Sequence, residues 1–375
     1  MLFLQIYKNK IANAIKILTV TILTYFLFIV EVPAQEKFDF LVSPFRQCWK
    51  IETGKIIPAN LASDNKNSNI LLSLLGGKLE SVSSRSGKKS WESELGGEII
   101  LKPFISKESI FVTTRTKDNI TVRSISRDSG ITNWQSSLDY TEQFFVTVLL
   151  NSLIVISKHG EILTLDINDG QLLSNYKTKL KFSTSPVIIG DQIIAGTTNN
   201  TIVFLSIKSR EFQELKVQNS PHLVSMVSNK YLFWNDYRGN SYLVDLLTRK
   251  TIWKFRSGAE ISNVISTKDS LLISSLDNFV YLVSIRKGKL LWKRRFSERF
   301  TTSFYITETQ AIITIPDANS AYIIDLEDGR TVNQVTTEEN NSFADAPIIF
   351  GKLIIYPTAR GLVAFTDSKT SCQQN

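Results

Sequence analysis

The chain has 375 residues, of which 43% are hydrophobic and 21% are charged, and its formal net charge is +8. This composition supports a sizeable core, either in two units or in one large all-β unit. The positive charges are spread along the sequence, and only Lys293–Arg295 with Arg299 approaches a cluster. A groove for nucleic acid would need clustered cations with interleaved aromatic residues, so we expect no nucleic-acid partner. An acidic surface on a protein partner stays an alternative.

Residues 1–34 carry the pattern of an export signal. Three lysines precede the apolar run Ile17–Val30, and Val32-Pro33-Ala34 forms a small-residue cleavage site. The run is short for a helix that spans a bilayer, so we expect a cleaved signal peptide, with a retained membrane anchor as the alternative. No cysteine follows a small-residue box here, which disfavours a lipoprotein. We expect residues 35–44 to be a linker and the protein to be periplasmic or secreted.

A two-residue turn signal recurs along the rest of the chain at intervals of 39 to 43 residues. The eight pairs are Ser86-Gly87, Ser129-Gly130, Asp169-Gly170, Ser209-Arg210, Thr248-Arg249, Lys287-Gly288, Asp328-Gly329 and Lys369-Thr370. Four residues before the second member of each pair stands a Ser, Asp or Thr, which can hydrogen-bond nearby backbone at the end of a strand. One residue earlier, all eight units have an apolar side chain. These columns indicate eight repeats of about 40 residues.

Each repeat contains material for four strands. A short apolar run, such as Leu153-Ile154-Val155, lies about ten residues upstream of the apolar column, and another strand precedes it. A further strand follows the turn. Because nothing between these strands has the length and period of a helix, we expect an all-β fold. Four strands per repeat of 40 residues predict an eight-bladed β-propeller of four-stranded antiparallel blades over residues 45–375.

The two ends of the chain complete one another. The last repeat stops before its outer strand, and the segment Gln47–Gly54 supplies a matching strand with Trp49. Pairing of these segments would close the ring without a free sheet edge. The same pairing would bring Cys48 and Cys372 together in an oxidising compartment, so we expect a disulfide between them. The alternatives are two unpaired thiols or a metal pair, although no His lies near either cysteine.

The segments Val244–Trp253 and Val283–Trp292 resemble the A-L-D-x-x-T-G-x-x-x-W repeat of the pyrroloquinoline-quinone-like propellers, and the resemblance covers residues 45–372. In that family the Trp docks against the next blade. The resemblance implies this blade-docking role for Trp49, Trp91, Trp134, Trp253 and Trp292. Ser174, Glu214 and Asn333 depart from the pattern, so three junctions between blades are expected to pack differently.

The sequence contains no recognisable catalytic set. Its two histidines, His159 and His222, stand outside any Ser-His-Asp or Cys-His motif, and we expect turn or packing roles for both. The segment Asp166–Gly170 alternates oxygen ligands before a Gly, but it lacks the downstream Glu of a calcium loop and lies on the repeat's own turn. We therefore predict no catalytic, cofactor-binding or metal-binding residues and no enzymatic activity.

The resemblance includes exported, non-enzymatic members such as the B subunit of the outer-membrane β-barrel assembly machinery, which is similar in size and has eight blades. It implies a monomeric, exported scaffold that binds protein partners, with outer-membrane protein assembly as its most concrete role. Two alternatives stay open. One is an oxidoreductase that holds pyrroloquinoline quinone and calcium, and the other is a propeller that senses a ligand or binds polysaccharide.

Overall fold

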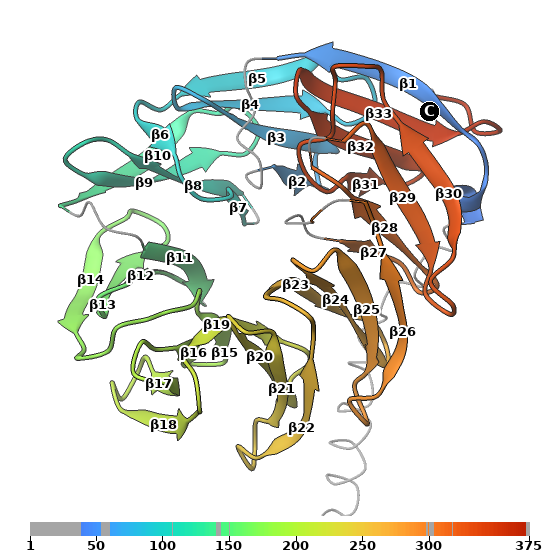
Figure 1. Cartoon of the computed structure of the whole chain (residues 1–375). Coiled ribbons are helices and arrows are strands. Elements are labelled where there is room, and N and C mark those ends of the chain that lie inside the picture. Colours follow the sequence, from blue (N-terminus) through green and yellow to red (C-terminus); the bar gives the residue numbers. More distant parts are fainter. Residues whose placement is uncertain are drawn as a thin grey trace, which may run out of the picture. The chain divides into compact units, whose positions relative to one another are not determined.

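Eight antiparallel sheets, arranged around a ring, make up the compact unit Phe38–Asn375 (Figure 1). The computed structural model describes residues 39–53, 61–106, 108–139, 144–149, 151–297, 299, 304–316 and 318–372. The expected signal peptide lies outside these residues. Among the described residues, no helix combines the length and the hydropathy needed to cross a membrane. The predicted all-β, eight-bladed propeller is confirmed.

We number the blades 1 to 8 in chain order, with the strands of each blade running from the centre of the ring to its rim. Blade 1 contains β2 (Ala62–Asp64), β3 (Asn69–Leu74), β4 (Lys78–Ser83) and β5 (Lys89–Glu94). Blade 2 contains β6 (Glu98–Ile99), β7 (Phe104–Ile105), β8 (Ser109–Arg115), β9 (Ile120–Ser126) and β10 (Thr132–Leu138). Blade 3 contains β11 (Phe144–Leu149), β12 (Ser152–Ser157), β13 (Glu161–Asp166) and β14 (Leu172–Lys177). Blade 4 contains β15 (Val187–Ile189), β16 (Gln192–Gly196), β17 (Thr201–Ser206) and β18 (Phe212–Lys216).

The second half of the ring repeats this order. Blade 5 contains β19 (Pro221–Met226), β20 (Tyr231–Asp236), β21 (Asn240–Asp245) and β22 (Thr251–Arg256). Blade 6 contains β23 (Ile261–Ser266), β24 (Ser270–Ser275), β25 (Phe279–Ser284) and β26 (Leu290–Arg295). Blade 7 contains β27 (Tyr305–Ile306), β28 (Gln310–Thr314), β29 (Ser320–Asp325) and β30 (Thr331–Thr336). Blade 8 contains β31 (Ile348–Phe350), β32 (Leu353–Thr358), β33 (Gly361–Asp367) and β1 (Phe45–Glu52).

The inner edge of blade 2 departs from the four-strand pattern. Its first strand is divided into β6 and β7, and both pair with β8. The register changes across residues 101–103, where Pro103 has no N–H group to donate to the ladder. The extra residues between the two short strands form an irregular connection of the kind that a bulge produces.

The core of the protein lies between blades. Each of the eight hydrophobic clusters combines side chains from two neighbouring blades, and together they cover every junction of the ring. The apolar column of the repeat is buried in all eight blades: Val82, Ile125, Leu165, Leu205, Val244, Val283, Ile324 and Phe365. A four-stranded sheet cannot cover its own apolar faces, so burial against both neighbours stabilises the ring as a whole.

The ring closes in blade 8, where the first strand of the chain pairs with the last. Strand β1 runs antiparallel to β33, from Phe45 opposite Asp367 to Glu52 opposite Gly361. The predicted closure by the N- and C-terminal segments is therefore confirmed. All described strands, including both partners of this closure, belong to the unit that begins at Phe38.

The segment before β1 packs onto the ring as well. Residues 39–42 form the 3-10 helix η1 (Asp39–Val42), and Leu41 is buried among side chains of blades 7 and 8. The backbone N–H of Ser368 donates to the carbonyl of Pro44 at 2.7 Å. The expected linker 35–44 thus includes residues that belong to the packed unit, because the apolar side chain of Leu41 packs in the core.

Candidate functional site

Five tryptophans on outer strands connect one blade to the next. Each indole N–H donates to a backbone carbonyl just after the third strand of the following blade, at 2.7 to 3.2 Å. The pairs are Trp49 with Ser84, Trp91 with Arg127, Trp134 with Ile167, Trp253 with Ile285 and Trp292 with Leu326. These are the five residues for which the family resemblance implies docking, and each lies against the neighbouring blade.

Each of these indoles covers a glycine of the next blade's outer turn, the connection between the third and fourth strands. The glycines are Gly87, Gly130, Gly170, Gly288 and Gly329, and all five have a positive φ. A Cβ on Gly130 would stand 2.5 Å from the ring of Trp91, so a larger residue cannot occupy that position without displacing the indole. The Trp of one blade and the Gly of the next therefore form a unit.

Two successive junctions lack both members of this unit. At the junction of blades 3 and 4, Ser174 replaces the Trp and Arg210 replaces the Gly. At the junction of blades 4 and 5, Glu214 replaces the Trp and Arg249 replaces the Gly. Both arginines keep the positive φ of the glycines, at 61° and 56°. With no indole above it, the turn can carry a side chain at this position.

The two arginines reach back to the preceding blade. The guanidinium of Arg210 lies 4.8 Å from the ring centre of Tyr176, and that of Arg249 lies 4.4 Å from the ring centre of Phe204. Arg249 also donates to the side-chain carbonyl of Gln213. Burial raises the pKa of the half-buried Tyr176 phenol, against the opposing effect of the Arg210 charge. Cation–π contacts thus replace the indole at both junctions.

The third junction without a Trp is filled by the segment before β1. Asn333 of blade 7 donates from its side-chain amide to the carbonyls of Leu41, at 2.9 Å, and Ser43, at 2.6 Å. Of the three departures from the repeat, this one supports the closure of the ring. The other two flank blade 4.

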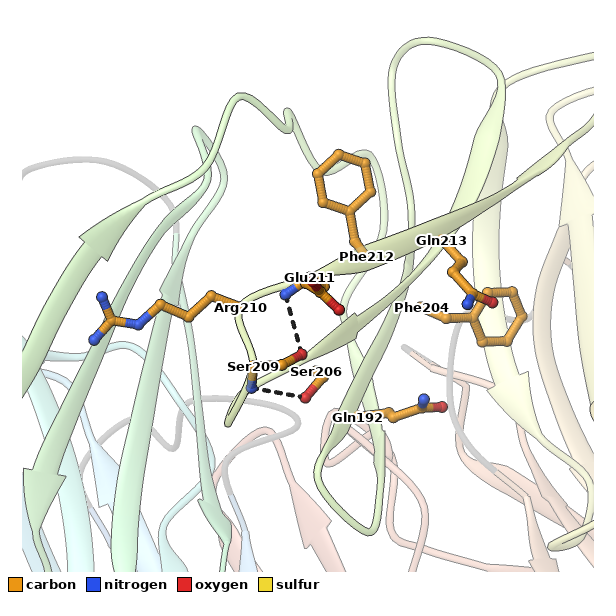
Figure 2. Close-up of a pocket in the computed structure, with 8 residues that line it drawn as sticks. All are labelled: Gln192, Phe204, Ser206, Ser209, Arg210, Glu211, Phe212 and Gln213. Atoms are coloured by element: carbon orange, nitrogen blue, oxygen red, sulfur yellow. Dashed lines mark hydrogen bonds between the residues drawn. The ribbon is translucent and has the colours of Figure 1, made fainter.

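Two grooves lie along blade 4, and the first of them lies at its junction with blade 3. One has a volume of about 640 Å³ and is lined by residues of β11 and by the turns of blade 4, including Leu149, Ile188 and Lys208. The other has a volume of about 570 Å³ and is lined by Gln192, Phe204, Ser206 and residues 209–213 (Figure 2). Figure 2 shows Arg210 pointing away from Phe204 and Gln213, toward the blade 3 side. Arg249 of blade 5 contacts two residues that line this second groove, Phe204 and Gln213.

Apolar side chains are exposed on the outer strands of blades 3 and 4, and one of them, Phe212, lines the second groove. Leu172 and Leu173, at the start of β14, are 54% and 56% exposed, and Phe212, at the start of β18, is 43% exposed. Exposed apolar groups on neighbouring elements next to a groove are typical of surfaces that bind another protein. We call this region, with the two grooves and these three side chains, the blade 4 surface.

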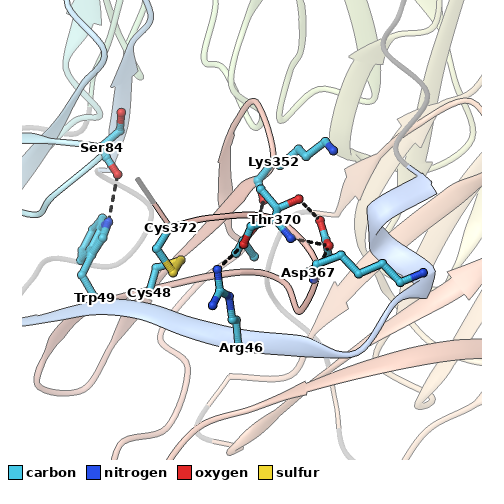
Figure 3. Close-up of a disulfide and its surroundings, with 10 residues drawn as sticks. Arg46, Cys48, Trp49, Ser84, Lys352, Asp367, Thr370 and Cys372 are labelled. Carbon is cyan, nitrogen blue, oxygen red and sulfur yellow. Dashed lines mark hydrogen bonds between the residues drawn. A yellow bond between two sulfur atoms is a disulfide. The ribbon is translucent and has the colours of Figure 1, made fainter. Parts of the chain in front are cut away.

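The predicted disulfide is present. Cys48 of β1 and Cys372 are joined, with their Cα atoms 5.3 Å apart (Figure 3). Around it, Arg46 donates to the carbonyl of Thr370, and Asp367 accepts the backbone N–H of Thr370 at 3.0 Å. Burial acts to raise the pKa of Asp367, but hydrogen bonds from Thr370 and Lys369 lower it overall. The carboxylate therefore holds the last turn of the chain against blade 8.

The histidines and the acidic turns have local partners. His222 Nε2 lies 2.7 Å from a carboxylate oxygen of Glu260, and its ring centre lies 4.1 Å from that of Tyr237. His159 is exposed in the turn between β12 and β13. In the segment Asp166–Gly170, both carboxylates accept backbone N–H groups of their own turn, at 2.7 and 2.9 Å. Within the described ranges, no three His, Cys, Asp or Glu side chains converge in a metal-binding arrangement.

Sequence reasoning missed the blade 4 surface. The three departures from the Trp pattern were visible, but the matching loss of Gly at the next turn was the signal that could have singled out blade 4. Arg210 follows Ser174, and Arg249 follows Glu214, at the same spacing along the chain that separates each Trp from its Gly at the other junctions.

Comparisons with known proteins agree with this fold. BamB from Moraxella catarrhalis has a structure that aligns with a TM-score of 0.65 and 16% identity over 88% of this chain and 100% of that chain. The computationally designed Ika8 protein aligns with a TM-score of 0.68 and 13% identity over 86% of this chain and 99% of that chain. At these identities the two structures show the fold alone. No curated protein sequence matches the chain.

A family model matches residues 46–255 and 239–374, which together cover almost the entire propeller. The matched family is described as outer membrane protein assembly factor BamB. The repeat columns, the eight blades and this match agree: the chain belongs to the BamB family of pyrroloquinoline-quinone-like propellers.

Proposed function

We propose that this protein is a periplasmic scaffold that binds a protein partner in outer-membrane protein assembly, and that it does so through the blade 4 surface. Family membership and the Cys48–Cys372 disulfide indicate a location outside the cytoplasm. The proposed role is binding rather than catalysis. The designed Ika8 protein has a similar fold, so the ring alone does not define the role, which depends on a particular surface.

The observation that carries the proposal is the coincidence of three features at blade 4. Its two junctions lack the Trp and Gly unit, and two grooves lie along it. Phe212, which lines the second groove, is exposed, as are Leu172 and Leu173 on the outer strand of the neighbouring blade 3. Exposure of a leucine or phenylalanine side chain to water is unfavourable. Burial of the side chain against a partner removes its apolar area from solvent and so stabilises the complex. Arg210 and Arg249 add cationic groups that are held in place by stacking.

The test is affinity capture from a membrane extract of the source cell, with the partner identified by mass spectrometry. We expect the parent chain to retain a specific protein of the outer-membrane assembly apparatus. The variant Leu173→Asp/Phe212→Asp should retain at least about tenfold less, because two charges then enter an interface that buries apolar groups.

The matched control is Ile131→Asp. Ile131 is 68% exposed in the outer turn of blade 2, so this variant also replaces an exposed apolar residue by a carboxylate, but away from blade 4. It should retain the partner as the parent chain does. Failure to capture a reproducible protein partner, or full retention by the Leu173→Asp/Phe212→Asp variant, would count against the proposal.

A further inference from the structure

The outer edges of blades 5 and 6 carry an unusual excess of positive charge. Residues 246–257 and 285–297 contain no Asp or Glu. Eight of their cationic side chains are exposed, and we call them the basic rim: Lys250, Lys254, Arg256, Arg286, Lys287, Lys289, Lys293 and Arg295. The sequence indicated a cluster only around Lys293, because Lys250, Lys254 and Arg256 lie about 40 residues away in the chain.

The fold makes these two stretches one surface. The indole of Trp253 on β22 donates to the carbonyl of Ile285 at 2.7 Å and covers Gly288. The outer turn of blade 6, with Arg286, Lys287 and Lys289, therefore lies directly against the outer strand of blade 5. Strand β26 continues from this turn with Lys293 and Arg295.

No carboxylate of the described residues neutralises the basic rim. None of its eight side chains forms an ion pair with a carboxylate of the described residues. Asp245, which directly precedes the first of the two stretches, accepts the backbone N–H of Thr248 at 2.8 Å. Blade 1 is different, since Lys78 and Lys89 on its rim pair with Glu92 at the same edge.

Exposed apolar side chains alternate with the cations. Leu247, at the tip of the outer turn of blade 5, is 92% exposed, and Leu291 on β26 is 51% exposed. Lys254 and Lys293 stand at equivalent positions of β22 and β26, each with its ammonium group about 5 Å from an aromatic ring centre of its own blade. These contacts support the stems of the lysines, while the two strands present the same apolar–Lys–Arg pattern, Ile252-Lys254-Arg256 and Leu291-Lys293-Arg295.

We propose that the basic rim binds the surface of a bilayer that contains anionic phospholipids. Such a surface offers a continuous sheet of negative charge, which matches cations distributed over two strands and two turns. Each Lys or Arg close to it strengthens binding by roughly fivefold, and exposed leucines enter the headgroup boundary. An acidic protein would have to match each cation with a carboxylate at a fixed position, and it would gain less from a leucine at the tip of a turn.

The experiment measures co-sedimentation of the unit Phe38–Asn375 with lipid vesicles. This unit contains all described strands and the closed ring, and it omits the apolar run of the leader, which would bind any bilayer. We expect binding to vesicles of phosphatidylcholine mixed with phosphatidylglycerol, weakening as salt is added, and no binding to pure phosphatidylcholine. The variant Lys293→Glu/Arg295→Glu should bind at least about tenfold more weakly.

The matched control is Arg85→Glu/Lys88→Glu, which makes the same change in charge at exposed positions of blade 1. It should bind within about twofold of the parent, because its charges lie away from the rim. Far-UV circular dichroism and thermal unfolding check that both variants keep the fold. The Leu173→Asp/Phe212→Asp variant should bind vesicles normally, which separates this proposal from the one for blade 4.

Three results would overturn the proposal. The first is no binding to anionic vesicles, and the second is undiminished binding by Lys293→Glu/Arg295→Glu. The third is retention of polyglutamate, but not of vesicles, by the parent chain. That result would assign the rim to an acidic protein.

Discussion

Trp91 of blade 1 lies so close over Gly130 of blade 2 that a Cβ on this glycine would stand 2.5 Å from the indole. The indole N–H at the same time donates to the carbonyl of Arg127 at 3.1 Å. Movement of the ring to accommodate a larger residue would therefore break a buried hydrogen bond. The Trp and the Gly belong to different repeats, yet each requires the other.

Substitution of Gly130 by Ala should lower the free energy of unfolding by about 2 to 4 kcal/mol, because strain at its positive φ adds to the clash with Trp91. The control is Gly190→Ala. Gly190 also has a positive φ, but a Cβ there would meet nothing within 4 Å, so only the backbone cost of about 1 kcal/mol is expected. Denaturant unfolding measures both. Equal losses in the two variants would show that the contact with Trp91 adds nothing.

The junction of blades 4 and 5 should accept the Trp and Gly unit only as a pair. Glu214→Trp alone places an indole over Arg249 and should destabilise the protein. Arg249→Gly alone loses the contact with Phe204. The double variant should be more stable than the sum of the single changes by about 1 to 2 kcal/mol, as a double-mutant cycle of unfolding free energies can measure. Simple additivity would mean that this junction differs from the others in its backbone and not only in its side chains.

Loss of the disulfide should destabilise the ring strongly. Cys48 and Cys372 are 324 residues apart, and a cross-link over so long a loop stabilises by at most about 6 kcal/mol on a chain-entropy estimate. We expect Cys48→Ser/Cys372→Ser to unfold at a clearly lower temperature than the parent chain. Addition of a reductant should lower the unfolding temperature of the parent and leave that of the variant unchanged. A parent that does not respond to complete reduction would refute this expectation.

Acid should destabilise blade 5 through Asp236. Burial acts to raise the pKa of this carboxyl, but hydrogen bonds from Asn240, Asn219 and the backbone lower it overall. A lowered pKa in the folded state contributes stability above the unfolded value of 3.8, and this contribution is lost as the pH falls through the folded value. Asp236→Asn should therefore be less stable at neutral pH by about 1 to 3 kcal/mol and lose less stability below pH about 4. Parallel pH profiles of the two proteins would contradict this assignment.

The repeat columns predicted most of the fold, because their signals lie within one blade. Local backbone geometry determines both the apolar column, which includes Phe365, and the turn pairs such as Asp328-Gly329. The segment Gln47–Gly54 has no partner within its own repeat, and it therefore indicated closure of the ring. The split of the first strand of blade 2 was not predicted, since the periodicity of the repeat does not record the change of register near Pro103.

The features of the candidate sites were harder to predict because they join residues from different blades. Arg210 and Tyr176 are 34 positions apart, and Asn333 finds its partners in Leu41 and Ser43 at the other end of the chain. No short-range pattern links such residues. Only the ring brings them together, and it also joins Lys254 to Lys287 in one surface.

The pairing of β1 with β33 has a consequence for biosynthesis. In an exported chain Cys48 crosses the membrane 324 residues ahead of Cys372, so the first strand has no partner until nearly the entire propeller has crossed. Blades 1 to 7 can assemble in order as they emerge, whereas blade 8 cannot. An unfinished chain keeps an exposed strand and a reactive thiol, and a protease or a chaperone can distinguish it by these features from the completed protein.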